Sequence, residues 1–136
     1  MSKTIIESDK VTVKAEQKIV FEYLNDFNNI KNLLPEDKIS DWESSVDHCS
    51  FKVQNAATIP LNKESVEEYS RINIVSGEKA PFPFTLYILL EDIGNETTGF
   101  LHFEGDINMF LKMMVEKPLT NLFNYMANQL KKNFEH

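Results

Sequence analysis

The sequence predicts an α+β fold in which one curved antiparallel sheet wraps around a long C-terminal helix. Apolar side chains recur at helical spacing through residues 109–134. In residues 39–107, by contrast, apolar and polar residues alternate in short runs, which is typical of half-buried strands. The turns between these runs are short and regularly spaced, as expected for strands that follow one another in an antiparallel meander.

Residues 109–134 predict one helix about 39 Å long, at a rise of about 1.5 Å per residue. Six apolar side chains fall in a sector about 100° wide, the width of a helix face that packs on a core. They are Leu111, Val115, Leu119, Leu122, Met126 and Leu130. Asn108 precedes the helix, and its side chain can accept a hydrogen bond from an unpaired N–H group of the first turn. Such a long helix needs a broad apolar surface to cover it, and the strands in the middle of the sequence supply that surface.

A first strand and two short helices are expected before the meander. Residues 3–14 alternate and predict the strand, whereas residues 16–24 change to a helical period. Asp26 can cap a second short helix, because its carboxylate accepts hydrogen bonds from the N–H groups of the following turn. Pro35 ends that second helix, since the residue before a proline avoids the helical conformation.

Six further strands are predicted, and with the first they make a seven-stranded sheet. They cover residues 39–44, 48–53, 58–67, 71–76, 82–92 and 97–107. The order is therefore one strand, two short helices, six strands and a long helix, which is an α+β arrangement. At 136 residues, with neither repeats nor a linker, the chain is expected to form a single domain over residues 1–136.

Charge and composition narrow the choice of partners. A net charge of −7 disfavours nucleic acid and anionic lipid surfaces, both of which attract clustered lysine and arginine. It suits a monomer or a weak homodimer. The one cysteine, Cys49, cannot form an internal disulfide, which favours a reducing compartment and predicts a cytoplasmic protein. No signal peptide is expected, and the most apolar run, residues 82–90, is too short for stable membrane insertion.

No set of catalytic, metal-binding or cofactor-binding residues stands out in the sequence. Three histidines and one cysteine show no zinc spacing, and no glycine-rich phosphate loop is present. His48 and Cys49 are neighbours on a predicted strand, so their side chains point to opposite faces and cannot act together. We therefore expect no metal, no cofactor and no catalytic residues.

This order of elements resembles the SRPBCC superfamily, also called the START-like or helix-grip fold, and in particular its single-domain bacterial-type members. The resemblance covers nearly the whole chain. It is carried by VTVKAEQKIVFEYLNDFNNIKNLLP (residues 11–35), SFKV (residues 50–53) and MMVEKPLTNLFNYMANQLKKNF (residues 113–134). The superfamily includes plant pollen-allergen-type lipid binders and polyketide cyclases. The resemblance implies a cavity between sheet and helix that binds apolar or amphipathic small molecules.

The residues expected to line this cavity come from the inward face of the sheet and from the long helix. The sheet residues are Phe51, Val53, Ile59, Leu61, Lys63, Ile72, Ile74, Phe84, Leu86, Leu101 and Phe103, and the helix residues are Met114, Leu122 and Met126. Methionine is flexible and polarisable, so it adapts to ligands of varied shape. The alternative is that all these side chains pack against one another and leave no cavity.

Lys63 has two interpretations. Strict alternation places its side chain on the cavity face with Ile59 and Leu61, where a cation could hold a carboxylate or phenolate. Alternatively, a strand end or a β-bulge at this point turns Lys63 to solvent.

Three functions are compatible with these features. The leading hypothesis is a non-catalytic module that binds or carries a small hydrophobic or amphipathic molecule. The second is an enzyme similar to polyketide cyclases or dehydratases, which the almost wholly apolar lining disfavours. The third is a protein-interaction domain with a filled core, working through a surface patch around Phe110, Met113 and the loop at residues 82–83.

Overall fold

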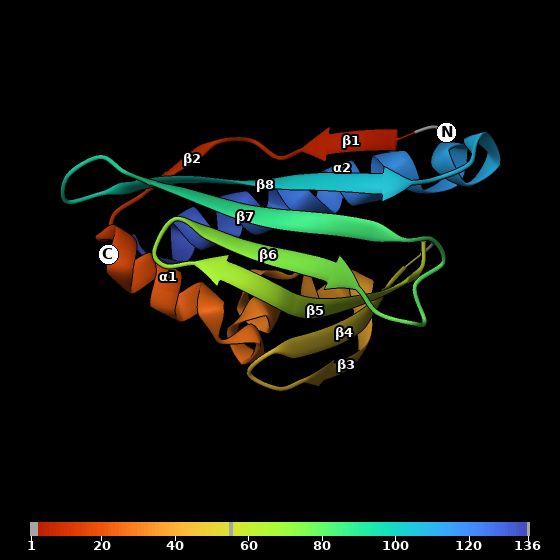
Figure 1. The fold of residues 1–136 in the computed structure, drawn as a ribbon, viewed down its shortest axis with the longest axis horizontal. Helices are drawn as coiled ribbons and strands as arrows, with labels where there is room; N and C mark the ends of the chain where they lie inside the picture. Colours follow the sequence, from red (N-terminus) through yellow and green to blue (C-terminus); the bar gives the residue numbers. More distant parts are fainter. Residues whose placement is uncertain (1–2, 55, 136) are drawn as a thin grey trace.

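The protein has two layers, a sheet and a set of helices on its concave side (Figure 1). The computed structural model describes residues 3–54 and 56–135. The elements in chain order are β1 (Lys3–Glu7), β2 (Val11–Val13), α1 (Gln17–Asn25), η1 (Phe27–Leu33), η2 (Glu36–Lys38), β3 (Ile39–Ser44), β4 (His48–Val53), β5 (Thr58–Glu67), β6 (Arg71–Ser76), β7 (Phe84–Asp92), β8 (Thr97–Asp106) and α2 (Met109–Asn133). The predicted α+β order and the long C-terminal helix are confirmed.

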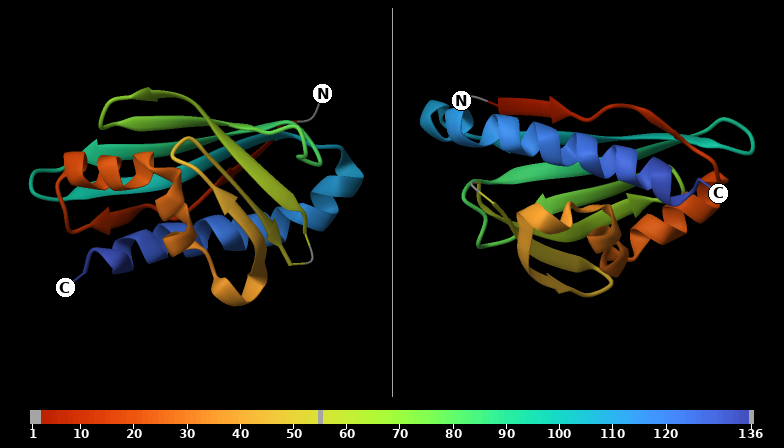
Figure 2. Two further views of the ribbon diagram at one scale, coloured as in Figure 1. Left: turned by 90° about the horizontal axis from the view of Figure 1, so that it is seen from below. Right: turned by 180° about the vertical axis from the view of Figure 1, so that it is seen from behind.

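All strand pairs in the sheet are antiparallel. The strand order is β1-β8-β7-β6-β5-β4-β3, and β2 also pairs with β8. The sheet curves around α2. Helix α1 and the two short η helices lie on the same side of the sheet, toward the C-terminal end of α2 (Figure 2). Strands β1 and β3 are the two edges of this order, far apart on opposite sides of the sheet.

In the described residues the sheet has eight strands rather than the predicted seven, because the first strand breaks after Glu7. The pairing register with β8 moves by one residue between β1 and β2. At the break, the Ser8 hydroxyl accepts a hydrogen bond from the Leu101 N–H at 2.8 Å. The Asp9 N–H donates to Asn124 Oδ1 of α2 at 2.8 Å, which ties the break to the helix. An extra residue of this kind bends a strand and increases its twist.

The second short helix, η1, is a 3₁₀ helix. Its buried residues Phe27, Ile30 and Leu33 are three apart, and side chains at this spacing align in a helix with three residues per turn. The predicted cap is present, since Asp26 Oδ1 accepts a hydrogen bond from the Asn28 N–H at 3.0 Å. The two helical segments therefore meet at Asp26 and do not form one rod.

Strand β7 begins at Phe84, two residues later than expected. Pro81 and Pro83 have no N–H group to donate to a strand ladder, which explains the delay. The Asp106 N–H donates to the Pro83 carbonyl at 3.0 Å, and Pro83 has no N–H group to donate in return.

Helix α2 buries one apolar stripe against the concave face of the sheet. Most of the predicted stripe is buried, together with two further residues: Val115, Leu119, Leu122, Phe123, Met126, Ala127 and Leu130. Leu111 is only half-buried, because the first turns of α2 extend past the end of the sheet (Figure 1). The predicted cap is confirmed, since Asn108 Oδ1 accepts a hydrogen bond from the Leu111 N–H at 2.9 Å.

Four phenylalanine rings fill the interior next to the middle of α2. The ring centroids of Phe84 and Phe103 lie 5.3 Å apart, and those of Phe103 and Phe123 lie 5.4 Å apart. Phe82 contacts Phe84 and Phe103 edge-on. These contacts join the sheet to the helix and fill the space between them.

We expect Gly105→Ala to destabilise the protein by about 1–3 kcal/mol, the usual cost of overpacking a core. A Cβ atom at Gly105 would lie 2.8 Å from Phe103 Cε1 and 3.0 Å from Ile107 Cδ1. Chemical denaturation measures the loss. In a Phe103→Leu background the same substitution should cost less, because the ring that it strikes is gone. Equal costs in both backgrounds would contradict this explanation.

Candidate ligand-binding site

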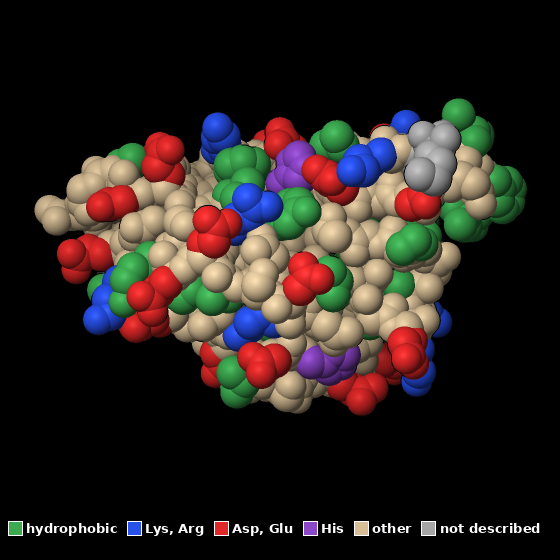
Figure 3. Space-filling model, viewed as in Figure 1, with side chains coloured by type: hydrophobic (Ala, Val, Ile, Leu, Met, Phe, Trp, Pro, Cys, Tyr) green, Lys and Arg blue, Asp and Glu red, His purple; other side chains and the backbone are tan. Residues whose placement is uncertain are grey.

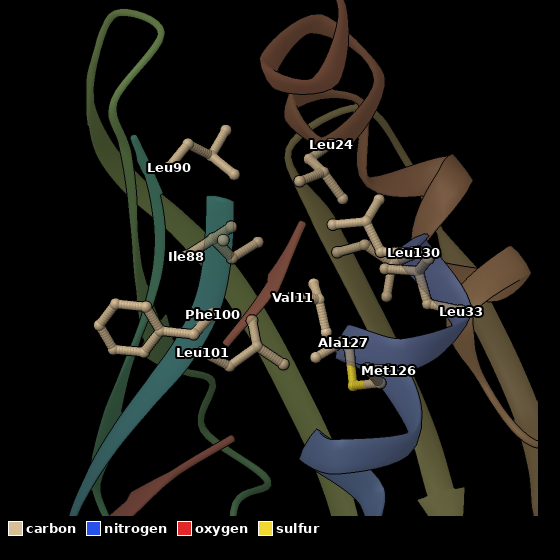
Figure 4. Close-up of a pocket in the computed structure, with 12 residues that line it drawn as sticks. Val11, Leu24, Leu33, Ile88, Leu90, Phe100, Leu101, Met126, Ala127 and Leu130 are labelled. Carbon is tan, nitrogen blue, oxygen red and sulfur yellow. The ribbon is translucent and has the colours of Figure 1, made fainter. Parts of the chain in front are cut away.

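A cavity lies between the sheet and the second half of α2, and we call it the enclosed cavity because all of its lining residues except Phe100 are buried. Its volume is about 20 Å³. The side chains around it come from α1, η1, α2 and strands β2, β7 and β8, and most of those in Figure 4 point toward one another. The lining consists of Val11, Leu24, Ile30, Leu33, Ile88, Leu90, Gly99, Phe100, Leu101, Met126, Ala127 and Leu130. No residue in this set carries an ionisable group.

The cavity lies where side chains from two strands, the long helix α2 and the 3₁₀ helix η1 meet. Leu101 and Ile88 project from neighbouring strands, where Leu101 pairs with Ile88 in the β7–β8 register. Met126 and Leu130 lie one helical turn apart on α2 and face them. The separate η1 segment closes the side with Leu33. The side chains of the strands, of α2 and of η1 do not fill the space between these elements completely, so a small apolar gap remains.

The enclosed cavity is too small for most ligands as it stands. A volume of about 20 Å³ admits about one water-sized sphere. Pockets for drug-sized molecules measure roughly 300–1,000 Å³. A ligand in this position would therefore have to displace the side chains that surround it.

Two open clefts lie on the outer side of α2, next to η1 and η2. One measures about 560 Å³ and is lined by Pro35, Asp37, Lys38, Val53, Gln54, Pro118, Asn121, Leu122 and Tyr125. The other measures about 790 Å³ and is lined by Tyr23, Lys31, Asn32, Leu34, Glu36, Asp37, Tyr125, Gln129 and Asn133. Both include Asp37 and Tyr125, so they adjoin. Buried Val53 and Leu122 form an apolar floor in the first cleft, below a polar rim.

The boundary between cavity and clefts is thin. On η1, Leu33 lines the cavity, and the next residue, Leu34, lines a cleft. On α2, Leu130 lines the cavity, and the adjacent Gln129 lines the same cleft. The contact between η1 and α2 is thus a wall one side chain thick. At its end, Asn133 Nδ2 donates a hydrogen bond to the Asn32 carbonyl at 3.1 Å.

The fourteen residues predicted to line the cavity separate into several groups. Leu101 and Met126 line the enclosed cavity, and Val53 and Leu122 line the first cleft. Met114 lies outside both, with 52% of its surface exposed. The remaining apolar members are buried in the packed interior: Phe51, Ile59, Leu61, Ile72, Ile74, Phe84, Leu86 and Phe103.

Lys63 contacts neither the cavity nor the clefts. The β-bulge of its second interpretation is present, since the β5–β6 register shifts between Lys63 and Ser65. The side chain is nevertheless largely covered, with 12% exposed. Its Nζ donates to the Asn25 carbonyl, lies 3.0 Å from Asp47 Oδ1 and sits 5.2 Å from the centroid of the Phe27 ring. These contacts join β5 to the end of α1.

Several residues that line the cavity are not predicted from the sequence to do so, namely Leu24, Ile30, Leu33, Ile88, Leu90 and Leu130. The sequence does predict Ile30 and Leu33 on the apolar side of a short helix. Nothing in their spacing shows that this side faces the same gap as Leu101. Only the position of η1 against α2 brings them together.

Cys49 is a buried thiol on β4. It is fully buried, and burial raises its pKa to about 12. The sequence predicts that Cys49, Phe51 and Val53 share one face, and all three are buried. The thiol therefore packs in the core as a small apolar side chain.

His102 lies on the outer face of the sheet between two carboxylates. Its Nδ1 is 2.6 Å from Glu7 Oε2 on β1, and its Nε2 is 2.8 Å from Glu104 Oε2. Burial lowers the pKa of His102, but hydrogen bonds and charge from Glu7 and Glu104 outweigh it, so the pKa is raised. The hydrogen bond from His102, followed by that from Lys3, lowers the pKa of Glu104.

Neither a metal site nor a membrane-spanning helix is found among the described residues. In residues 3–54 and 56–135, no three His, Cys, Asp or Glu side chains gather closely enough to hold a metal ion. No helix within that part of the chain is both long and apolar enough to cross a membrane.

The start of α2 exposes an apolar tip, consisting of Met109, Phe110, Met113 and Met114. Their exposed fractions are 70%, 71%, 79% and 52%. Figure 3 shows hydrophobic side chains gathered at this end of the molecule. Phe82, which the sequence placed in the same patch, is instead buried at 5% exposure.

Comparison with solved structures shows the fold. A point mutant of norcoclaurine synthase from Thalictrum flavum, in complex with a transition-state analogue, matches with a TM-score of 0.74 and 13% identity over 98% of this chain and 94% of the other. A START superfamily protein from Mycobacterium smegmatis matches at 0.69 and 10% identity, over 96% of both chains. The Zhui aromatase/cyclase from Streptomyces sp. R1128 matches at 0.67 and 15% identity, over 97% and 96%.

These likenesses support the START-like, or SRPBCC, helix-grip fold that the sequence resembles. At these levels of identity they establish the fold alone. No protein-family model matches the sequence, and no curated protein matches it.

We expect the Cys49 thiol to be unreactive toward Ellman's reagent in the folded protein at neutral pH. Burial excludes the reagent, and the raised pKa suppresses the thiolate that reacts. The control is the protein in guanidinium chloride, where one equivalent of thiol should react at once. Rapid reaction under native conditions would show that β4 is accessible.

We expect His102 to titrate above its ordinary pKa of 6.5 in an NMR titration of the imidazole protons. A raised pKa in the folded state stabilises the protein fully below pH 6.5, and this stabilisation is lost as the pH rises through the folded value. The difference in unfolding free energy between wild type and His102→Gln should therefore shrink above pH 6.5. Glu7→Gln should move the His102 pKa downward. An unchanged value would rule out this carboxylate as a cause.

Proposed function

We propose that the protein binds a small hydrophobic or amphipathic molecule between the sheet and α2. The observation that carries the proposal is the enclosed cavity whose twelve lining residues are apolar or glycine. A gap of this kind stays dry and attracts apolar groups, because an enclosed water there would have no hydrogen-bond partners. Leu101 and Met126, predicted from the sequence, would contact the ligand together with Leu33 and Leu130.

The ligand would enter through the wall between η1 and α2. Leu33 and Leu34, and likewise Gln129 and Leu130, face opposite sides of that wall. The 3₁₀ helix η1 is the part expected to move, since its hydrogen-bond geometry is poorer than that of an α-helix. Displacing η1 would join the cavity to the clefts and enlarge the space available.

The lining indicates the ligand's chemistry. No ionisable group faces the cavity, so the part of the molecule held there is uncharged and apolar. The neighbouring cleft offers Tyr23, Lys31, Asn32 and Gln129, which could hydrogen-bond a polar end that stays near solvent. A molecule with an apolar body and one polar end fits both regions.

The structural neighbours are consistent with this proposal. The norcoclaurine synthase structure contains a transition-state analogue, so a chain with this fold can bind a small organic molecule. The aromatase/cyclase neighbour corresponds to the alternative that this protein is a cyclase-like enzyme. Proton transfer needs positioned acids or bases, and none line the cavity here, so simple binding is the better-supported function.

A protein-interaction domain is the second candidate. The exposed apolar tip of α2 favours it, because contiguous exposed apolar side chains often mark contact sites. The same binding experiment separates the two, since an interaction domain with a filled core has no need to accept an apolar molecule.

The test is a titration with the neutral dye N-phenyl-1-naphthylamine, whose fluorescence rises in apolar surroundings. Wild type should bind the dye, and Leu130→Ala, which enlarges the cavity, should bind it more tightly. Ala127→Leu fills the cavity and should weaken binding by about tenfold or more, which corresponds to about 1.4 kcal/mol.

Leu119→Ala is the matched control. Leu119 is buried like Leu130 and lies on the same helix, but it does not line the cavity. Both truncations should cost about 2–5 kcal/mol of stability, yet only the change at Leu130 should affect dye binding. If a folded Ala127→Leu protein binds the dye as wild type does, the ligand does not occupy this cavity. Native mass spectrometry of the purified wild type would show any molecule carried from the cell.

A further inference from the structure

Strand β1 is an open edge of the sheet, and it differs from the opposite edge. In the described residues no strand pairs with the far side of β1, which forms the upper border of the sheet in Figure 1. The other edge, β3, is interrupted by a register shift between Ser40 and Glu43, where Asp41 has a φ of 55°. Bulges and charges of one sign prevent edge strands from pairing. β1 is regular over all five of its residues.

The hydrogen-bonding phase of β1 shows which groups face outward. The Ser8 N–H donates to the Leu101 carbonyl at 2.9 Å, and the register pairs Glu7 with His102. In an antiparallel ladder, residues bonded to one neighbour alternate with residues that face away from it. The β1 residues bonded to β8 are therefore Thr4 and Ile6.

A second hydrogen bond supports this phase. The Asp106 N–H donates to the Pro83 carbonyl on the other side of β8. Even-numbered residues of β8 thus bond to the β7 side and odd-numbered ones to the β1 side, in agreement with the bond at Leu101. The N–H and C=O groups of Lys3, Ile5 and Glu7 accordingly point to the open edge.

The side chains of these same three residues are exposed and form a self-complementary pattern. Ile5 is 55% exposed, and the side chains of Lys3 and Glu7 are 66% and 54% exposed. If two copies of β1 pair antiparallel about Ile5, Lys3 of each copy stands opposite Glu7 of the other. Opposite charges on facing residues stabilise a strand pair, and like charges destabilise it.

The pairing of Lys3 with Glu7 matters for self-association because the chain as a whole is negatively charged. A net charge of −7 opposes self-association in general. Pairing two copies of β3 would bring together Asp41 and Glu43 from each copy. At β1 the facing charges cancel instead, and both signs lie along this border of the sheet in Figure 3.

We propose that two copies of this chain associate through antiparallel pairing of their β1 strands, centred on Ile5, which joins the two sheets into one. The symmetry is two-fold, and each copy contributes the same surface to the contact. A contact of two five-residue strands is smaller than the roughly 1,000 Å² expected of a stable complex, so the dimer is weak and reversible.

The test is a pair of charge reversals followed by sedimentation velocity over a series of protein concentrations. Wild type should show an average mass that rises toward the dimer as concentration increases. Lys3→Glu places acids opposite each other across the strand pair, and Glu7→Lys places lysines opposite each other, so each variant alone should remain monomeric. An equimolar mixture should recover the dimer, because each carboxylate of the first variant's strand then faces a lysine of the second.

The mixture is the decisive measurement. Each reversal also disturbs a contact within its own chain, Lys3 with Glu104 or Glu7 with His102. Loss of such a contact could weaken a variant, but mixing two weakened variants would not restore association unless their strands pair. Met113→Lys is the control for a dimer formed by the apolar tip, and it should leave association unchanged. A wild type that stays monomeric, a dimer that survives both reversals, or a mixture that does not recover would overturn the proposal.

Discussion

The fold depends on covering the apolar stripe of α2 with a single concave surface. An isolated helix of this composition would expose the stripe, so its stability comes mainly from packing against the sheet. A flat sheet would touch a helix along a narrow line, whereas a bent one surrounds it. The register shifts in β3 and β5 and the break between β1 and β2 are irregularities that bend and twist strands. They let one antiparallel sheet enclose the helix.

The same geometry decides where space remains. Beside the middle of α2, the rings of Phe82, Phe84, Phe103 and Phe123 reach from both layers and fill the gap. Beside the second half, α1 and η1 replace part of the sheet as the covering surface. Their side chains meet those of α2 and β8 without filling the space between them completely. The enclosed cavity thus lies where the wall is made of short helices, and short segments of this kind open more readily than a strand ladder.

The polar residues serve mainly to connect elements. Lys63 ties β5 to the end of α1, and His102 links β1 to β8 through Glu7. Asn124 and Asn128 of α2 hold Asp9 at the break in the first strand. None of these polar groups lines the cavity, whose surroundings are therefore apolar. An apolar interior suits the binding of uncharged molecules, and an edge with balanced charges at β1 suits pairing with a second copy.

The sequence by itself determined most of the elements, their order and the buried face of the main ones. Alternation in the strands and the stripe of α2 are local patterns, so the caps at Asp26 and Asn108 and the buried set Cys49, Phe51 and Val53 could be read from them. The tertiary structure alone decided how much space remains inside and which residues surround it. Ile30 and Leu33 face the same gap as Leu101 only because η1 rests against α2. Lys63 lies on the inward face as alternation predicts, but its partners Asn25, Asp47 and Phe27 hold it away from the cavity. Cavities arise from small mismatches between packed surfaces far apart in the chain, and a periodic pattern carries no information about such mismatches.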